Sequence, residues 1–407
     1  MLVKNAGYEV KEQKERPTMR YRKLGNTNLD VSILGFGAMR MPMVGNPRGM
    51  AGFDPSIPID EPEALKMVHH ALEQGINYYD TAYGYHGGQS ETFIGKALKS
   101  YRTKVLIATK LPVWNIEKPE DFQRIFDEQL KKLDTGYLDF YLVHGLGRAT
   151  WAKMKDMGVL KFMDTLRASG RIRYAGFSFH DEVKVFKDII DSYDWDMCQI
   201  QYNFYDQNYQ AGKEGLTYAS ARGIGVVVME PLRGGRLVDR IPPEVQALWD
   251  TAPVKKSPAE WAMRWVWNHR DVSVVLTGAS TPAQLADHTR IVKDAAPDSL
   301  TPQELDLFDR VQAVYRTMLQ VDCTGCGYCV PCPSGVDIPH NFQLYNDAFL
   351  FKDAEFSTFA YNQFLTPEQR ASECTECLTC LEKCPQQINI PEELKKVHQT
   401  LVKKASD

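Results

Sequence analysis

The chain has 407 residues, of which 43% are hydrophobic, and its formal net charge of −4 comes from interspersed acidic and basic residues. The length suggests one large domain and one smaller domain of a globular protein, and the charge pattern gives no sign of a nucleic-acid partner. No apolar run reaches the roughly 20 residues that span a bilayer. The first 18 residues lack an apolar core and are interpreted as an extension rather than a secretory signal, so we expect a cytoplasmic protein that binds neither nucleic acid nor membrane.

From about residue 31, short apolar stretches rich in β-branched and aromatic residues alternate with stretches of helical periodicity. The predicted helical stretches include residues 63–75, 119–134 and 181–193. The eight predicted strands cover residues 31–37, 77–80, 105–110, 139–144, 174–178, 197–203, 225–230 and 273–278. Alternation of this kind produces parallel strands with crossover helices, and eight repeats over roughly 260 residues match the size of a (β/α)₈ barrel.

An open doubly wound sheet is the alternative architecture. Such a sheet usually carries G-x-G-x-x-G after its first strand, whereas the first predicted strand here is followed by "LGFGAMRMP". The barrel is therefore favoured. Two long irregular segments, 39–60 and 231–258, follow the first and seventh strands, and both would lie on the face of a barrel that holds active sites.

The strand–helix rhythm ends near residue 300, where one more helix is expected over 301–319 before the cysteines. We predict an N-terminal extension (1–18), a barrel domain (19–300) and a small, mainly helical domain (301–407). The fold class is thus α/β, a (β/α)₈ barrel followed by a helical domain.

Polar residues stand at the carboxyl ends of three predicted strands. Asp80 ends the second strand, Lys110 the third and His144 the fourth, while Tyr85 lies on the loop after Asp80. Barrel enzymes carry their catalytic groups at these ends, and unpaired charges are costly to bury. Asp80 and Lys110 could instead pair as a structural part of the rim, but four functional groups at one rim favour catalysis.

These four groups suit hydride transfer to a carbonyl compound. A tyrosine hydroxyl can protonate the alkoxide that forms, and a lysine ammonium beside it would lower its pKa from the usual value of about 10. Asp80 would keep Lys110 charged and in place. A neutral His144 could donate a hydrogen bond to the carbonyl oxygen and orient it.

The stretch "YDTAYGYHGGQSETFIG" (79–95), followed by "ATK" at 108–110 and "DFYLVH" at 139–144, resembles the aldo-keto reductase family. The resemblance extends from about residue 19 to 295 and includes the entry "YRKLGNTNLDVSILGFGAM", which is similar to a hairpin that closes the bottom of the barrel. It implies a barrel that binds NAD(P)H across its mouth without a Rossmann fold. It also implies a catalytic tetrad of Asp80, Tyr85, Lys110 and His144, with Tyr85 as general acid.

The same resemblance implies contacts along an extended cofactor. Residues near the nicotinamide ribose would be Gly37, Ala38 and Met39, and Ser178 and Gln199 would bind the carboxamide. Met229 would replace the ring that stacks on nicotinamide. The pyrophosphate would lie along Leu232, Arg233 and Gly234. The adenosine end would contact Gly278, Ser280, Gln284, Asp287 and His288.

Two of these positions depart from the family pattern. Phe179 stands where the family often has asparagine, which puts that carboxamide contact in doubt. Gln284 stands where a basic residue often holds the 2′-phosphate of NADPH, and its neutrality favours NADH. Arg233 or Arg236 could compensate.

Eight of the nine cysteines form two sets, Cys323, Cys326, Cys329 and Cys332, and then Cys374, Cys377, Cys380 and Cys384. Without a secretory signal a disulfide framework is not expected. The second set has the C-x₂-C-x₂-C-x₃-C-P spacing of a bacterial [4Fe–4S] run, and the first is one residue shorter before its last cysteine. Zinc is the alternative metal, and a single cluster also stays open. Cys198, in an apolar stretch, is interpreted as a buried thiol.

In two-cluster ferredoxins the fourth cysteine of each run binds the other cluster. By this rule Cys384 joins Cys323, Cys326 and Cys329, and Cys332 joins Cys374, Cys377 and Cys380. The segment between the sets has predicted helices at 341–356 and 366–373 and resembles the α-helical ferredoxin type.

The sequence therefore predicts an NAD(P)-dependent oxidoreductase for a small carbonyl or alcohol substrate, with two [4Fe–4S] clusters. The clusters would be structural or sensory, or an electron route to a redox partner protein. An electron-transfer or redox-sensing subunit is the alternative function.

Overall fold

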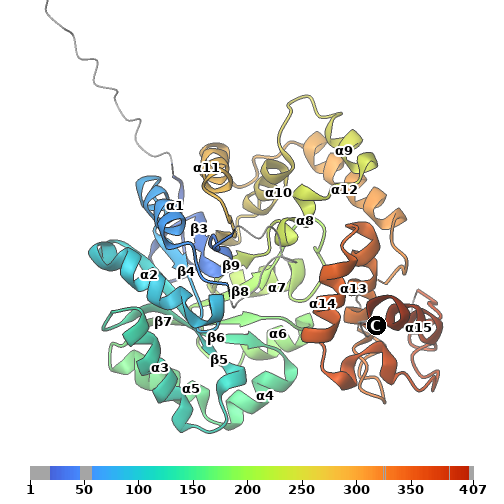
Figure 1. The fold of residues 1–407 in the computed structure, drawn as a ribbon, viewed down its shortest axis with the longest axis horizontal. Helices are drawn as coiled ribbons and strands as arrows, with labels where there is room; N and C mark the ends of the chain where they lie inside the picture. Colours follow the sequence, from blue (N-terminus) through green and yellow to red (C-terminus); the bar gives the residue numbers. More distant parts are fainter. Residues whose placement is uncertain (1–18, 46–56, 324, 326, 385, 403–407) are drawn as a thin grey trace, which may run out of the picture.

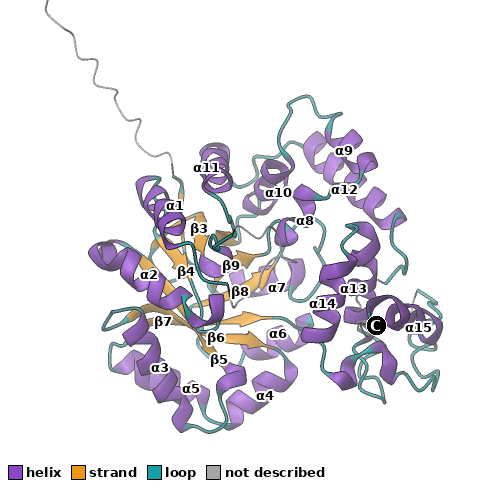
Figure 2. Ribbon diagram, in the orientation of Figure 1, coloured by secondary structure: helices purple, strands orange, loops and turns teal. Residues whose placement is uncertain are grey.

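The computed structural model describes residues 19–45, 57–323, 325, 327–384 and 386–402. The chain forms a barrel of parallel strands surrounded by helices, with the cysteine-rich helices, drawn in red, packed at one side (Figure 1 and Figure 2). This arrangement confirms the predicted fold class.

A short hairpin precedes the barrel. Its strands β1 (Tyr21–Lys23) and β2 (Asp30–Ser32) pair antiparallel. Leu24 and Val31 are fully buried among the side chains that fill the barrel interior. The predicted hairpin is confirmed, and the stretch expected to form one strand over 31–37 divides between β2 and the first barrel strand.

The barrel consists of eight parallel strands in the closed order β10-β3-β4-β5-β6-β7-β8-β9. Each was predicted from an apolar stretch. Their bounds are β3 (Leu34–Gly37), β4 (Tyr78–Asp80), β5 (Leu106–Pro112), β6 (Leu138–Leu146), β7 (Ile172–Phe179), β8 (Met197–Gln201), β9 (Gly225–Met229) and β10 (Val272–Thr277).

Side chains alternate between the barrel interior and the surrounding helices, as the two-residue period of a strand requires. In β6, Phe140 and Leu142 belong to the interior cluster, whereas Tyr141 and Val143 belong to the larger core between strands and helices. The interior is therefore a packed core, and the space for chemistry lies at the carboxyl ends of the strands.

The helices around the barrel begin with favourable caps. The side chains of Asp60, Ser257 and Thr281 each accept a hydrogen bond from the backbone N–H three residues later. The helices are α1 (Glu61–Glu73), α2 (Ser90–Leu98), α3 (Glu120–Lys132), α4 (Arg148–Asp156), α5 (Val159–Ala168), α6 (Val183–Ile190), α7 (Gly212–Ser220), α8 (Arg236–Asp239), α9 (Pro243–Trp249), α10 (Pro258–Trp267) and α11 (Pro282–Ile291).

Short 3₁₀ helices occur in the loops of the barrel. They are η1 (Ala38–Arg40), η2 (Tyr85–Gly88), η3 (Lys99–Lys104), η4 (Val113–Asn115), η5 (Arg233–Gly235) and η6 (Val292–Asp294). The segment 231–258, expected to be irregular, thus contains η5, α8 and α9. The other segment expected to be irregular, 39–60, lies partly outside the described residues.

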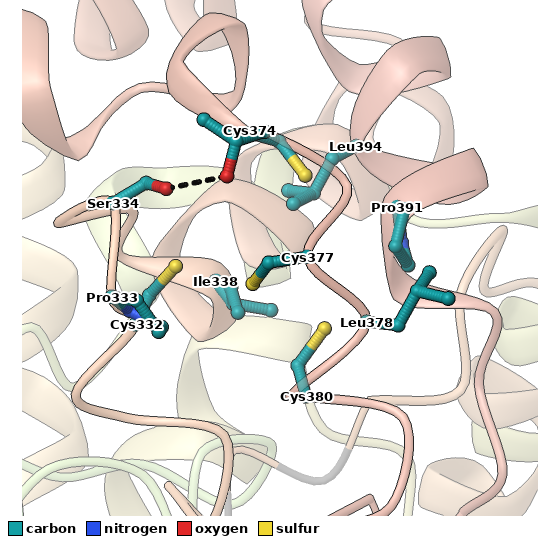
Figure 3. Close-up of a pocket in the computed structure, with 11 residues that line it drawn as sticks. Cys332, Pro333, Ser334, Ile338, Cys374, Cys377, Leu378, Cys380, Pro391 and Leu394 are labelled. Atoms are coloured by element: carbon teal, nitrogen blue, oxygen red, sulfur yellow. Dashed lines mark hydrogen bonds between the residues drawn. The ribbon is translucent and has the colours of Figure 1, made fainter.

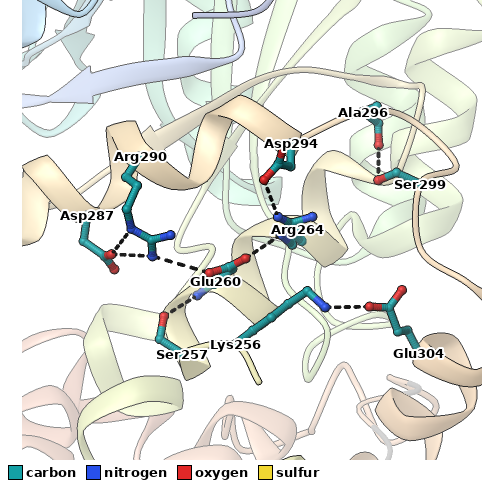
Figure 4. A network of polar contacts seen from close by, with 10 residues as sticks. All are labelled: Lys256, Ser257, Glu260, Arg264, Asp287, Arg290, Asp294, Ala296, Ser299 and Glu304. Atoms are coloured by element: carbon teal, nitrogen blue, oxygen red, sulfur yellow. Dashed lines mark hydrogen bonds and ion pairs between the residues drawn. The ribbon is translucent and has the colours of Figure 1, made fainter. Parts of the chain in front are cut away.

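Helix α12 (Pro302–Thr317) packs on the barrel. Its Phe308 lies edge-on against Trp249, with ring centroids 5.1 Å apart, and shares the barrel core. Glu304 of α12 pairs with Lys256 at 2.7 Å, near the ion pairs that link α10 and α11 (Figure 4). The domain boundary was predicted at residue 300, before this helix. From its packing we propose that the barrel domain extends through α12.

The cysteine-rich domain has its own core, to which Val336, Phe342, Tyr361 and Leu394 contribute. Its helices are α13 (Ile338–Leu350), α14 (Ala354–Gln363) and α15 (Ile390–Leu401), joined by the 3₁₀ helices η7 (Pro367–Gln369) and η8 (Ala371–Glu373). The helical stretch predicted over 341–356 is thus split between α13 and α14, and 366–373 forms only 3₁₀ turns. Among the described residues, none of the helices combines the length and apolar character that crossing a membrane requires.

Candidate active site and cysteine pocket

Three neighbouring strands bring the predicted catalytic residues together. Asp80 is the last residue of β4, Lys110 lies in β5 and His144 lies in β6. The strands pair in parallel, with Asp80 opposite Ala108 and Pro112 opposite His144. Since their carboxyl ends meet at one rim, the three side chains reach the same space.

Lys110 is the centre of this group. Its Nζ atom donates to Oδ1 of Asp80 at 2.6 Å, to the carbonyl oxygen of Thr81 at 2.8 Å and to the hydroxyl of Tyr85 at 3.4 Å. Asp80 and Lys110 are both almost fully buried. A buried cation needs such partners, so the strand ends form a connected chain from Asp80 through Lys110 to Tyr85.

The titration of Tyr85 differs from the sequence-based expectation. Burial raises the pKa of Tyr85 above its usual value, and the nearby Lys110 cation only opposes this effect. Although burial lowers the pKa of Lys110, its partners Asp80 and Tyr85 outweigh that, and the Lys110 pKa is raised. The expected lowering of the Tyr85 pKa by Lys110 is present, but burial outweighs it, and burial could not be judged from the sequence. The result is a protonated phenol beside a charged lysine.

His144 stands opposite Tyr85, with ring centroids 6.0 Å apart, and the Trp114 ring packs on it at 4.7 Å. Burial, with the Lys110 charge as a further cause, holds the His144 pKa well below its usual value, so the ring is neutral. Its Nδ1 atom forms no hydrogen bond to any described residue. A neutral imidazole at this place can donate to a carbonyl oxygen.

A group of buried polar side chains is hydrogen-bonded to the backbone of Lys110. Glu91 accepts hydrogen bonds from Thr109 and from Gln129, each at 2.6 Å. Gln129 also donates to the carbonyl oxygen of Lys110 at 3.0 Å and accepts from the Tyr141 hydroxyl at 2.8 Å. Sequence analysis missed these supporting roles, because Gln129 is one of many polar residues on the amphipathic α3 and nothing in the sequence marks it as buried.

Two residues predicted to bind the nicotinamide carboxamide lie on neighbouring strands, Ser178 near the end of β7 and Gln199 in the middle of β8. Ser178 accepts a hydrogen bond from the backbone N–H of Gly145 at 2.8 Å. Gln199 donates to Oδ2 of Asp80 at 3.4 Å, while its own Oε1 atom is buried without a hydrogen bond to any described residue. An unsatisfied buried oxygen fits the N–H of a carboxamide, so these residues fit the group that was predicted for them.

Arg40, which sequence analysis did not single out, connects several predicted cofactor segments. It directly follows Gly37, Ala38 and Met39 and pairs with Glu230 at 3.3 Å, one residue after Met229. A Cβ atom on Gly278 would lie 3.5 Å from its Cδ atom. The loops after β3, β9 and β10 therefore meet around this one side chain. The signal available in the sequence was its position directly after "LGFGAM".

Arg233 is one of the residues predicted to lie along the pyrophosphate. Its guanidinium is buried and pairs with Asp206 at 2.9 Å and with Asp347 of α13 at 2.6 Å. These carboxylates hold the side chain, and the placement of Arg233 along the pyrophosphate stays a prediction. Its neighbours Leu232 and Gly234 are half-buried at the carboxyl end of β9.

At the predicted adenosine end, most polar side chains bond to one another. Gln284 accepts from the Ser280 backbone N–H at 2.9 Å. His288 is buried and bonds to Thr277 at 2.7 Å, and burial lowers its pKa to about 4. Asp287 accepts from Arg290, which belongs to the ion-pair network of Figure 4. Of the four polar residues predicted here, Ser280, Gln284, Asp287 and His288, Gln284 is the one that is exposed.

A family model described as the aldo/keto reductase family matches residues 34–311, which contain all of these strands and loops. The chain belongs to the aldo/keto reductase family.

Curated relatives in this family cover most of the barrel. L-galactose dehydrogenase from Arabidopsis thaliana is 26% identical over 297 residues, which are 67% of this chain and 88% of that protein. The uncharacterized oxidoreductase YqkF from Bacillus subtilis is 26% identical over 318 residues, covering 70% of this chain and 94% of YqkF. This aldo/keto reductase is thus related to oxidoreductases.

Solved structures agree with the fold. The holo form of aldo-keto reductase AKR11C1 from Bacillus halodurans is 27% identical, with a TM-score of 0.59, and the match covers 72% of this chain and 96% of that one. The thermostable aldo-keto reductase Tm1743, at 23% identity and a TM-score of 0.57, shows the fold alone.

Three cysteines of the second set of this aldo/keto reductase line one small pocket with Cys332 of the first set. Cys332, Cys374, Cys377 and Cys380 surround it, together with apolar residues such as Ile338. Figure 3 shows their sulfur atoms turned toward the same space. A set of four thiols is the usual ligand set of a [4Fe–4S] cluster, so these residues fit the group.

The other predicted cluster ligands are Cys323, Cys326, Cys329 and Cys384. Cys323, Cys329 and Cys384 are half-buried against the core of the cysteine-rich domain, and Cys326 lies outside the described residues. A Cβ atom on Gly327 in this set would lie 3.2 Å from Glu182, just before α6, so the first set lies against the barrel. A 4Fe-4S dicluster family model matches residues 322–389. Cys198 is buried in β8, as interpreted.

Proposed function

We propose that this aldo/keto reductase uses NAD(P)H to reduce an aldehyde or ketone, or oxidises the corresponding alcohol in reverse. The observation that carries the proposal is the hydrogen-bonded chain from Asp80 through Lys110 to Tyr85, with neutral His144 facing Tyr85. This is the set of groups that carbonyl reduction requires at one place.

When bound, the nicotinamide supplies a hydride to the carbonyl carbon. His144 donates a hydrogen bond to the carbonyl oxygen and orients it. Tyr85 gives its hydroxyl proton to the oxygen as negative charge develops there. Lys110 stabilises the phenolate that Tyr85 becomes, and Asp80 keeps Lys110 charged.

We propose that the carboxamide contacts Ser178 and Gln199, and that Gly37, Ala38, Met39 and Met229 line the nicotinamide end. The unpartnered oxygen of Gln199 supports this assignment. At the adenosine end we propose Gly278, Ser280, Gln284, Asp287 and His288. Since Gln284 is neutral, NADH is the proposed cofactor: a 2′-phosphate is held best by a basic side chain.

We propose two [4Fe–4S] clusters in the cysteine-rich domain. Cys332, Cys374, Cys377 and Cys380 would hold one, supported by the pocket they line. Cys323, Cys326, Cys329 and Cys384 would hold the other, by the crossed pairing of two-cluster ferredoxins.

The test is a screen of aldehydes and ketones with NADH and with NADPH, on protein purified anaerobically with its iron. Oxidation of the cofactor that depends on a carbonyl compound supports the proposal. If no carbonyl compound is reduced while NADH binds to the protein, the barrel is a sensing or scaffolding unit and the catalytic proposal is wrong.

Electron exchange between the clusters and a partner protein is a second candidate. It is supported by the exposure of Tyr328 in the first cysteine set and Leu378 in the second, 65% and 54%, which leaves the segments around the proposed clusters open to a partner's surface. Reduction of the clusters by NADH, followed by reoxidation on addition of a carbonyl substrate, would instead couple them to the barrel's own reaction.

A further inference from the structure

One carboxylate of the cysteine-rich domain joins two arginines of the barrel. Asp347 lies in α13, and its Oδ1 accepts from Arg233 at 2.6 Å while its Oδ2 accepts from Arg236 at 3.0 Å. Asp347 is only 2% exposed. Both of its oxygens are therefore used in contacts between the two domains.

The two arginines belong to residues 230–236, here called the cofactor loop, which follows β9 at the mouth of the barrel. Arg233 is enclosed from several sides, with Asp206 at 2.9 Å and the rings of Tyr205 and Phe351 at 5.0 and 5.3 Å. A guanidinium so surrounded is held in one position. With its charge already paired, Arg233 can act on a bound dinucleotide through the position of its backbone rather than through direct charge.

The cofactor loop needs such support. Glu230 and Arg233 have φ angles of 56° and 50°, and Gly234 and Gly235 are also left-handed. Non-glycine residues in this region are strained and persist only where surrounding contacts hold them. Of the carboxylates that hold Arg233, Asp206 belongs to the barrel and Asp347 to the other domain.

We propose that Asp347 positions the cofactor loop through Arg233 and Arg236, so that the cysteine-rich domain forms a working part of the nicotinamide cofactor site. This inference rests on the proposed function, since the loop carries Leu232 and Gly234, which the family resemblance implies lie along the pyrophosphate. Asp347 is a positioning residue: it acts on the cofactor only through the loop.

The test is Asp347→Asn, which keeps the shape of the side chain and removes its charge. Because a buried arginine pair then loses a carboxylate, we expect the Kd for NADH to rise about tenfold or more. The kcat at saturating NADH is expected to stay within about twofold, because the catalytic groups on β4, β5 and β6 are unchanged. A purely structural role would lower the amount of folded protein without this split between Kd and kcat.

Arg240→Gln is the matched control. Arg240 lies outside the cofactor loop, pairs with Asp353 at 3.2 Å and donates to the carbonyl oxygen of Lys352. The variant therefore weakens the same domain interface and leaves in place the contacts of the loop itself, including the pair between Arg236 and Asp353 at 3.5 Å. An unchanged Kd in this variant supports the proposal. An equal rise in both variants would mean that general loosening of the interface is responsible and would overturn it.

Asp347→Glu is measured alongside in case Asp347→Asn does not fold, with iron content and thermal unfolding as checks. Glutamate keeps the charge but displaces it by one methylene, so a smaller rise in Kd is expected. Unchanged NADH binding in a folded Asp347 variant overturns the inference and leaves the proposed function intact. Absence of binding of both NADH and NADPH by the unaltered protein would instead overturn the proposed function.

Discussion

The Nζ atom of Lys110 lies 2.6 Å from Oδ1 of Asp80, and the two side chains are 1% and 3% exposed. Removing one member of such a pair leaves an uncompensated buried charge. Lys110→Met is therefore expected to lower the free energy of unfolding by about 3–5 kcal/mol. The double variant Asp80→Asn/Lys110→Met, which leaves no charge behind, should lose less than the sum of the two single variants. Urea unfolding of all four proteins measures this, and strictly additive losses would contradict it.

Tyr85→Phe removes the proposed proton donor and keeps the ring. We expect kcat/KM for carbonyl reduction to fall by about 10²–10⁴-fold, the usual contribution of a general acid, with the Kd for NADH unchanged. Tyr83→Phe is the control on the same loop, because the Tyr83 hydroxyl bonds to Glu128 and not to the tetrad. Normal turnover in Tyr85→Phe would show that another group protonates the product.

We predict that His288 makes the free energy of unfolding depend on pH. Burial lowers its pKa to about 4, whereas in the unfolded chain it is near 6.5, so between these values the unfolded state binds more protons. Its stabilising contribution is complete above pH 6.5 and is lost as the pH falls toward 4. The loss amounts to about 3 kcal/mol.

His288→Gln, which can keep the hydrogen bond to Thr277, should flatten the slope of unfolding free energy against pH in this window. His69→Gln, at an exposed position of α1, serves as the comparison and should leave the slope as it is. Any acid sensitivity of the cysteine-rich domain is shared by all three proteins and cancels. Identical slopes in His288→Gln and the unaltered protein would contradict the prediction.

Much of the fold and the tetrad was predictable because the signals are local. The apolar stretches that became β3 to β10 are rich in β-branched residues, and Asp80 and Lys110 stand out as polar residues at the ends of apolar strands. In a barrel, parallel strands bring such ends together regardless of distance along the chain. Periodicity and position therefore pointed to Asp80, Lys110 and His144, whereas the family resemblance implied the tetrad and the role of Tyr85 in it.

What could not be predicted depends on distant contacts. Asp347 lies 114 residues after Arg233, and nothing in either neighbourhood indicates the other. The amphipathic pattern of α12 shows that one face is buried but not that the barrel covers it. The direction of the Tyr85 pKa shift was missed for a related reason, since it is a balance between burial and the Lys110 charge, and burial is a property of the whole fold.

We predict that the preference between NADH and NADPH can be changed at Gln284. This exposed residue bonds to Ser280, and a cation here would face the proposed adenosine end. Gln284→Arg is expected to raise kcat/KM for NADPH relative to NADH by about 10- to 100-fold, the worth of a hydrogen bond to a charged phosphate. Gln284→Leu loses the hydrogen bond to Ser280 without adding a charge. It should leave the ratio of kcat/KM for NADPH to that for NADH unchanged. Initial rates with both cofactors decide this, and an unaltered ratio in the arginine variant would place the 2′-position elsewhere.

The crossed arrangement of cysteines predicts the effect of changing Cys332, which belongs to the first set in sequence but lines the pocket of the second. Cys332→Ala should lower the iron content from about eight atoms per chain toward about four, because only the cluster shared with Cys374, Cys377 and Cys380 loses a ligand. Iron and sulfide counts after anaerobic purification measure this.

Cys198→Ala is the control for loss of a thiol, because Cys198 is fully buried in β8 within the barrel core. Its iron content should stay complete. Loss of nearly all iron in Cys332→Ala would mean that the clusters assemble together or that only one is present. Full retention would mean that Cys332 is not a ligand and that each cysteine set binds on its own. The intermediate iron count is the outcome that supports two clusters with exchanged fourth ligands.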